Sequence, residues 1–135
     1  MELGMESTVK EIVVRADIET LVNLFYDKIR KDDLLAGIFD SVIKDWSQHL
    51  EKMYRFWETV LLGEKTYRGN PFLPHANFKI DKTHFDRWIE LFEETVDENF
   101  YGEIALESKW RAEKMAEMFQ LKMEYYLNHP NRLAI

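Results

Sequence analysis

Apolar residues recur along most of this chain with the 3.6-residue period of an amphipathic α-helix. The first such segment follows Asp17, which can cap a helix, and it ends in the charged run RKDD at residues 30–33. Its apolar face consists of Ile18, Leu21, Val22, Phe25 and Ile29. The stretch LLAGIFD that comes next predicts a short helical turn or corner.

A second long helix is predicted from Asp45 to Leu62, with Gly63 well placed to end it. His49 lies on the same helical face as the apolar residues of this segment, which are Trp46, Leu50, Met53, Phe56, Trp57, Val60 and Leu61. A third helix can start at Asp81 or Thr83, and a fourth runs from about Glu103 to Leu127. We find no alternating strand pattern of useful length and no internal repeat, so the chain is predicted to be all-α.

The segment NPFLPHANFK, between the second and third predicted helices, breaks this pattern. Proline fixes φ and lacks an N–H donor, so Pro71 and Pro74 prevent a regular helix here. The stiff backbone holds His75 between two amphipathic segments. Either this loop only joins two helices and leaves a solvated histidine, or the direction of the imidazole matters.

Composition narrows the range of functions. The 135 residues and 46% hydrophobic content suit one domain with one core, and 14% of the residues are aromatic. A net charge of -7 argues against nucleic acid or an anionic membrane surface as the main partner. No cysteine is present, so thiolate metal sites are excluded. The start of the chain has no signal-peptide pattern and no apolar run approaches a membrane span, so we expect a cytoplasmic protein.

Few residues suggest chemistry by themselves. His49 and His75 are too far apart for a local metal chelate but can face each other across a flat cofactor. His49 is equally well explained as a hydrogen-bonded core histidine, and Tyr26 as a core ring whose hydroxyl needs a partner. His84 and His129 are expected at the surface. The carboxylates of FEETVDENF, which are Glu93, Glu94, Asp97 and Glu98, have the spacing of a charged outer helix face.

Three blocks together resemble the truncated haemoglobins, and in particular their third group. The blocks are LFYDKIRKDDLLAGIF, DWSQHLEKMYRFWETVLLGEKTYRGNPFLPH and FDRWIELFEETV, within a resemblance from about Ile18 to Tyr126. Gly37, Gly63 and Gly69 stand singly, as in the third group, whereas paired glycines mark the other two. The resemblance implies a shortened globin fold, a two-over-two helical sandwich around haem. It divides the chain into an N-terminal extension at 1–16, a globin domain at 17–128 and a C-terminal tail at 129–135.

The resemblance also implies a role for each site residue. His75 would be the proximal ligand of the iron in haem b, with the proline loop replacing helical rigidity in aiming it. Tyr26 and Trp88 would be distal hydrogen-bond donors, and His49 would face the bound ligand. Phe39 and Met53 would pack against the haem, and the candidates for holding its propionates are Lys52, Tyr67 and Arg68.

Two functions follow from this resemblance. The first is binding or transport of O2, with NO and CO as further diatomic ligands, because donors near partially negative bound O2 slow its release. The second is a haem enzyme that oxidises nitric oxide or acts like a peroxidase, which would need an unidentified reductase. A haem-free helical interaction domain is the third reading. The sequence leaves the oligomeric state open.

Overall fold

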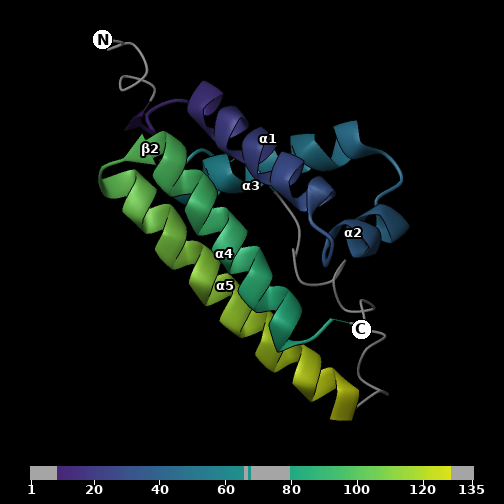
Figure 1. Cartoon of the computed structure of the whole chain (residues 1–135). Coiled ribbons are helices and arrows are strands. Elements are labelled where there is room, and N and C mark those ends of the chain that lie inside the picture. Colours follow the sequence, from purple (N-terminus) through teal and green to yellow (C-terminus); the bar gives the residue numbers. More distant parts are fainter. Residues whose placement is uncertain (1–8, 66, 68–79, 129–135) are drawn as a thin grey trace.

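The computed structural model describes residues 9–65, 67 and 80–128 and shows five helices within them (Figure 1). The helix expected after Asp17 is α1 (Arg15–Lys31), and the short helical turn expected after it is α2 (Ala36–Val42). The three later helices are α3 (Trp46–Leu62), α4 (Lys82–Asn99) and α5 (Glu103–Asn128). Each agrees closely with the range that the apolar periodicity predicts.

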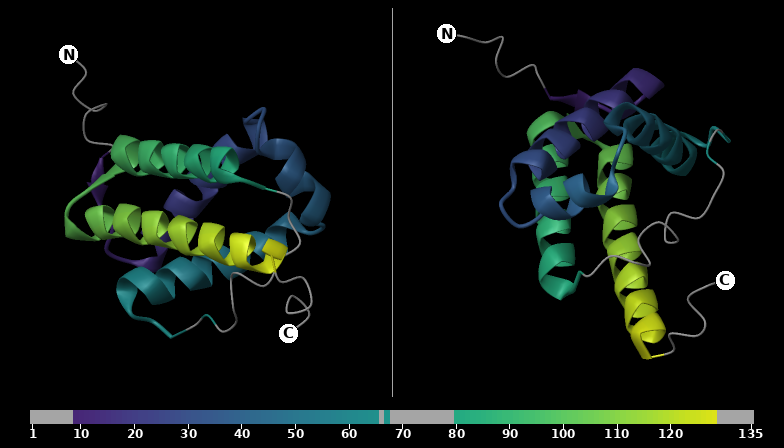
Figure 2. Two further views of the ribbon diagram at one scale, coloured as in Figure 1. Left: turned by 90° about the horizontal axis from the view of Figure 1, so that it is seen from below. Right: turned by 90° about the vertical axis from the view of Figure 1, so that its right-hand side faces the viewer.

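The helices form two stacked pairs. α4 and α5 run side by side in opposite directions, and α1 and α3 cross over them as the second pair (Figure 2). α2 extends from the end of α1 and leads the chain into α3. The expected all-α, two-over-two arrangement is therefore confirmed. Within the described residues no helix combines the length and the apolar composition that crossing a membrane requires.

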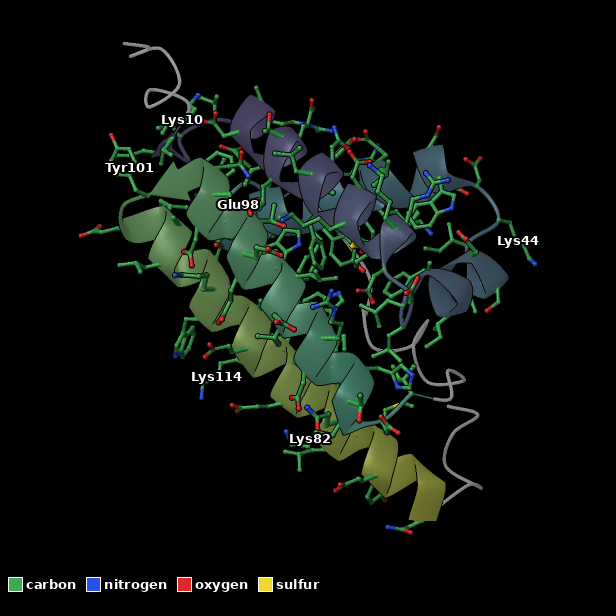
Figure 3. The ribbon with its side chains drawn as sticks, in the orientation of Figure 1. Lys10, Lys44, Lys82, Glu98, Tyr101 and Lys114 are labelled. Atoms are coloured by element: carbon green, nitrogen blue, oxygen red, sulfur yellow. The ribbon has the colours of Figure 1, made fainter. Side chains whose placement is uncertain are left out.

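A very short parallel sheet ties the segment before α1 to the corner between α4 and α5, and the sequence did not predict it. β1 (Lys10–Glu11) pairs with β2 (Phe100–Tyr101), which lies in the corner between α4 and α5 (Figure 3). Gly102 follows with φ of 100°, a left-handed conformation that favours glycine. Strands of two residues carry no alternating pattern, so periodicity cannot reveal them.

The helix ends follow the expected capping chemistry at three places. The Asp45 carboxylate accepts the Gln48 N–H at the start of α3, and the Asp81 carboxylate accepts the Thr83 N–H at the start of α4. Gly63 ends α3 with φ of 77°, the left-handed conformation expected there. These local signals operate within a few residues, so the sequence alone reveals them.

One expectation about a helix start is wrong, and one histidine is less exposed than expected. Asp17 is not the cap of α1, which begins at Arg15; it caps from inside the first turn by accepting the Val13 and Val14 N–H groups at 2.8 and 3.0 Å. His84, which was expected at the surface, is half-buried, with 20% of its side chain exposed. Its Nδ1 accepts the Asp81 N–H at 3.0 Å, and this bond holds the ring against the start of α4.

The carboxylate cluster of α4 lies on the outer face, as expected, but its members differ. Glu94 and Glu98 pair with Lys28 of α1, and Asp97 pairs with Lys109 of α5. Glu93 instead faces another acid, Glu113 of α5. A hydrogen bond with Glu113, together with burial and charge repulsion, raises the pKa of Glu93 to about 7.

This acid pair predicts a pH dependence of stability. Folding raises the pKa of Glu93 from its usual 4.5 to about 7, so the folded state binds the proton more tightly. The resulting stabilisation is complete below pH 4.5 and is lost as pH rises through about 7. Lys109 offsets part of the repulsion and Asp97 adds to it.

Glu93→Gln should therefore raise the free energy of unfolding at pH 8 by about 1 kcal/mol, after allowance for solvent screening, and leave it nearly unchanged at pH 4.5. Urea unfolding at the two pH values measures this. Glu64→Gln, which removes an exposed charge elsewhere, is the matched control. An equal change for Glu93→Gln at both pH values would show that the proton is not shared across α4 and α5.

Candidate functional site

A hydrogen bond between Tyr26 and His49 joins α1 to α3 in the interior of the fold. The Tyr26 hydroxyl oxygen and His49 Nε2 are 3.1 Å apart, although 23 residues separate them in the sequence. Tyr26 is only 7% exposed, and burial raises the pKa of its hydroxyl. The hydroxyl therefore stays protonated near neutral pH and can act as a hydrogen-bond donor.

Aromatic rings surround this polar pair. The Tyr26 ring makes edge contacts with Phe25, Phe39 and Trp46, at centroid distances of 5.2, 6.1 and 5.8 Å. Trp46 also contacts the His49 ring at 5.8 Å. A tyrosine hydroxyl and an imidazole thus lie together within an apolar environment, where each hydrogen bond has greater electrostatic strength than in water.

Trp46 belongs to this site, and the sequence analysis treated it only as an apolar helix residue. It lies three residues before His49 on α3, so both side chains share one face of the helix. That spacing was the available signal. The Arg30 guanidinium, at the end of α1, lies over the Trp46 ring at 4.4 Å from its centroid. This cation–π contact fixes the indole between the ends of two helices.

Phe25 lies between Trp88 and Tyr26 and contacts both of their rings. The Trp88 ring lies edge-on to Phe25 at 5.3 Å and is stacked with Phe92 at 5.8 Å. The neighbouring Arg87 donates to the buried Asp32 carboxylate at 2.7 Å, which ties α4 to the end of α1. The structure therefore brings Trp88 into the same aromatic cluster as Tyr26, though without a direct contact between the two rings among those described.

The remaining described candidates come from α2, from α3 and from the segment after α3. Phe39 is buried on α2, and Met53 is partly buried one turn beyond His49. The Tyr67 ring lies edge-on to Phe56 at 5.3 Å, and burial raises the pKa of its hydroxyl. Lys52 is exposed on α3, one turn from His49.

His75 and Arg68 lie outside the described residues, so the structure does not test their roles. The segment that carries His75 connects the end of α3 at Leu62 to the start of α4 at Lys82. It thus joins the two helices that carry His49 and Trp88.

Comparison with known proteins identifies the fold family. The sequence profile of the bacterial-like globins matches residues 7–125. This chain belongs to the bacterial-like globin family. The group 3 truncated hemoglobin ctb of Campylobacter jejuni is 32% identical to this globin over 124 residues, which cover 88% of this chain and 98% of that protein.

The three-dimensional comparison agrees with the sequence comparison. The crystal structure of a group III truncated hemoglobin from Campylobacter jejuni superposes on this globin with a TM-score of 0.76 and 31% sequence identity. The match covers 84% of this chain and 93% of the other. The resemblance to the third group of truncated haemoglobins is confirmed.

Membership of the globin family implies haem and the binding of diatomic ligands. The described residues fit a flat, largely apolar group. Large side chains of α3, α4 and the segment after α3 pack against the core but are only partly buried; these are Trp46, Leu50, Met53, Tyr67, Trp88 and Ile89. A planar apolar macrocycle could cover such surfaces while its polar edge reaches water.

Proposed function

We propose that this globin binds O2 tightly at a non-covalently held haem b, with Tyr26 and His49 stabilising the bound gas. The observation that supports this proposal is the Tyr26–His49 hydrogen bond of 3.1 Å inside an aromatic enclosure. Haem iron, when present, supplies the position at which a diatomic ligand binds. Without cysteine the chain cannot form a thioether link to haem, so non-covalent haem b is the form that fits.

The direction of the Tyr26–His49 bond decides what Tyr26 can do. If the Nε2 of His49 carries a proton and donates it to the Tyr26 oxygen, the Tyr26 hydroxyl proton is left for a ligand. If Nε2 is unprotonated, Tyr26 donates to it instead, and the donor is lost to the ligand. We propose the first arrangement when O2 is bound, with His49 orienting Tyr26 and Trp88 as a second donor.

The other residues of the site have supporting roles in this proposal. His75 is the proximal ligand, and Phe39 and Met53 pack against the macrocycle. Lys52, Tyr67 and Arg68 hold the propionates. A cytoplasmic location stays a prediction.

An absorption spectrum of the purified protein tests the proposed function. After loading with haem, the ferrous protein should form a stable O2 complex that converts to a CO complex when CO is added. Failure to retain haem, or immediate oxidation by O2 without a detectable complex, would contradict tight O2 binding.

Haem should also stabilise the fold. A ligand that binds only the folded state raises the free energy of unfolding, by about 2.7 kcal/mol at a free concentration of about 100 times Kd. We expect a thermal midpoint higher by about 5 to 10 °C for the haem-loaded protein than for the apoprotein. Differential scanning calorimetry measures both midpoints, and equal values would argue against a haem-filled core.

The second candidate function is haem-based redox catalysis, such as oxidation of nitric oxide or a peroxidase-like reaction. The observation in its favour is the same His49, since an imidazole hydrogen-bonded to Tyr26 can take up or release a proton beside the ligand. Repeated turnover with an added reductant would favour catalysis, whereas one slow conversion per protein would favour O2 binding.

A further inference from the structure

One face of α5 carries an exposed stripe of large apolar side chains. Leu106, Trp110, Leu121 and Tyr125 are 63%, 53%, 66% and 43% exposed. Lys114 and Glu117 continue the same line between them, and both are exposed. We call these six residues the α5 stripe. Figure 3 shows its Lys114 pointing away from α4.

The α5 stripe lies opposite the face that α5 buries in the fold. At 3.6 residues per turn, the buried residues of α5 fall about half a turn away from the stripe; they are Ala105, Ser108, Ala112, Ala116, Phe119 and Met123. The helix therefore has two apolar faces and covers only one of them within the chain. Exposed apolar patches of this kind mark interaction surfaces more often than isolated exposed residues do.

The spacing of the six stripe residues along the sequence reads the same from either end of the stripe. Its positions 106, 110, 114, 117, 121 and 125 are separated by four, four, three, four and four residues. Stripe positions that are eleven residues apart, such as 106 and 117, are separated by about three full helical turns and so lie on nearly the same side of the helix. The stripe therefore runs nearly straight along α5. Two copies of the stripe can therefore align in opposite directions, with each position facing a position of the other copy.

That antiparallel alignment matches the chemistry at every position. Leu106 faces Tyr125 of the second copy, and Trp110 faces Leu121, so apolar side chains meet apolar side chains. At the centre Lys114 faces Glu117, and the reverse pair forms across the two-fold axis. Within one chain these two groups are 3.5 Å apart in an exposed ion pair, so the exchange requires only small side-chain movements.

A groove beside the stripe could receive a side chain from the second copy. The groove, of about 560 Å³, lies between α4 and α5, with Ile89, Ala116 and Leu121 as its apolar lining. Its polar lining is mainly acidic and consists of Lys82, Asp86, Glu113, Glu117, Gln120 and Glu124.

Two cations lie beside Trp110 in the other half of the stripe, and each is paired with an acid, Arg111 with Glu107 at 3.0 Å and Lys114 with Glu117 at 3.5 Å. Arg111 and Lys114 lie near the face of the Trp110 ring, with the guanidinium carbon 5.6 Å and the ammonium nitrogen 5.8 Å from its centroid. Opposite Leu121, the Trp110 of a second copy would meet the edge of the acidic groove. A tryptophan flanked by cations fits an apolar groove with an acidic rim.

We propose that this globin forms an antiparallel, two-fold symmetric homodimer through the α5 stripe, with Trp110 of each copy seated at the α4–α5 groove of the other. A parallel alignment in register would instead place Lys114 against Lys114 and Glu117 against Glu117. The stripe is about 29 Å long at 1.5 Å per residue. A single pair of helices of this length makes a small interface, so the dimer is reversible, with Kd of about 1 to 100 μM.

Sedimentation velocity on the haem-loaded protein, over a concentration range that spans this Kd, tests the association. The wild type should shift from monomer to dimer as concentration rises. Trp110→Glu removes both aromatic anchors and sets a carboxylate against each acidic groove, so Kd should rise by at least about 100-fold. Val42→Glu, at an exposed apolar position on α2, is the matched control and should dimerise like the wild type.

A charge exchange tests the antiparallel alignment. Lys114→Glu alone places two acids together at each central position, and Glu117→Lys alone places two bases together, so either should weaken the dimer by about 5- to 10-fold. The double variant Lys114→Glu/Glu117→Lys should recover the wild-type Kd. No recovery in the double variant would contradict this pairing.

Cross-linking gives a test that does not depend on affinity. The chain has no cysteine, so introduced thiols report only the designed contact. An oxidised mixture of Lys114→Cys and Glu117→Cys chains should yield mainly the mixed disulfide. A disulfide can join only two cysteines whose Cα atoms lie within about 7 Å of each other. A monomer at all concentrations, an unchanged dimer in Trp110→Glu, or the random 1:2:1 ratio of the three disulfides from an equal mixture of the two variants would overturn the proposal.

Discussion

Replacing His75 by alanine is expected to abolish the proximal bond to iron while leaving the helical fold intact. Proline fixes φ, so Pro71 and Pro74 are expected to stiffen the loop that aims His75. No neighbouring residue in the loop offers a comparable nitrogen ligand. The ferrous absorption spectrum of His75→Ala should differ from that of the wild type, and added imidazole should restore most of it.

His129→Ala provides the control for this experiment, because that histidine also adjoins a proline but lies near the C-terminus. Its spectrum should match the wild type. If His75→Ala keeps the wild-type ferrous spectrum and ligand kinetics, another residue is the proximal ligand. Circular dichroism of each variant separates loss of the ligand from loss of the fold.

Tyr26→Phe is expected to speed O2 dissociation by about 5- to 30-fold. The substitution removes one hydroxyl from a buried site and keeps the ring that packs against Phe39 and Trp46. Losing a hydrogen bond of about 1 to 2 kcal/mol corresponds to that change in rate. CO accumulates less negative charge than O2, so its dissociation should change much less. Stopped-flow kinetics with both gases provide the measurement.

The outcome with the two gases distinguishes hydrogen bonding from steric effects. Equal acceleration of O2 and CO release would mean that Tyr26 acts by occupying space. His49→Leu should change O2 release less than Tyr26→Phe does, because the proposed arrangement has His49 act on the ligand through the tyrosine hydroxyl. In a Tyr26→Phe background, His49→Leu should then have almost no further effect on O2 release, and an undiminished effect would indicate a direct contact.

The sequence by itself predicted the helices and most of their ends. The apolar period gave the ranges of α1 and α3–α5, while Asp45, Gly63 and Asp81 marked ends that the structure confirms. These signals come from residues within one or two helical turns, where hydrogen bonds and side-chain spacing are local. The sequence was misleading about the position of Asp17 in α1, and it placed the half-buried His84 at the surface. It also gave no sign of β1 and β2.

The family resemblance identified more of the candidate site residues than helical periodicity did. Periodicity placed His49 on an apolar helix face but could not separate a core histidine from a ligand-facing one. The resemblance selected Tyr26, His49 and Trp88 together, and the structure places all three in one aromatic cluster. Their roles toward haem, like those of His75 and Arg68, stay predictions.

Only the tertiary structure decided which surfaces meet. It paired Tyr26 with His49, set Trp46 beside both of them, and brought Glu93 of α4 against Glu113 of α5. These contacts join residues from different helices, and a helical period reports which face of a helix is apolar without reporting what covers that face. The crossing of the two helix pairs fixes the contacts, because side chains of one helix must fit between those of the next.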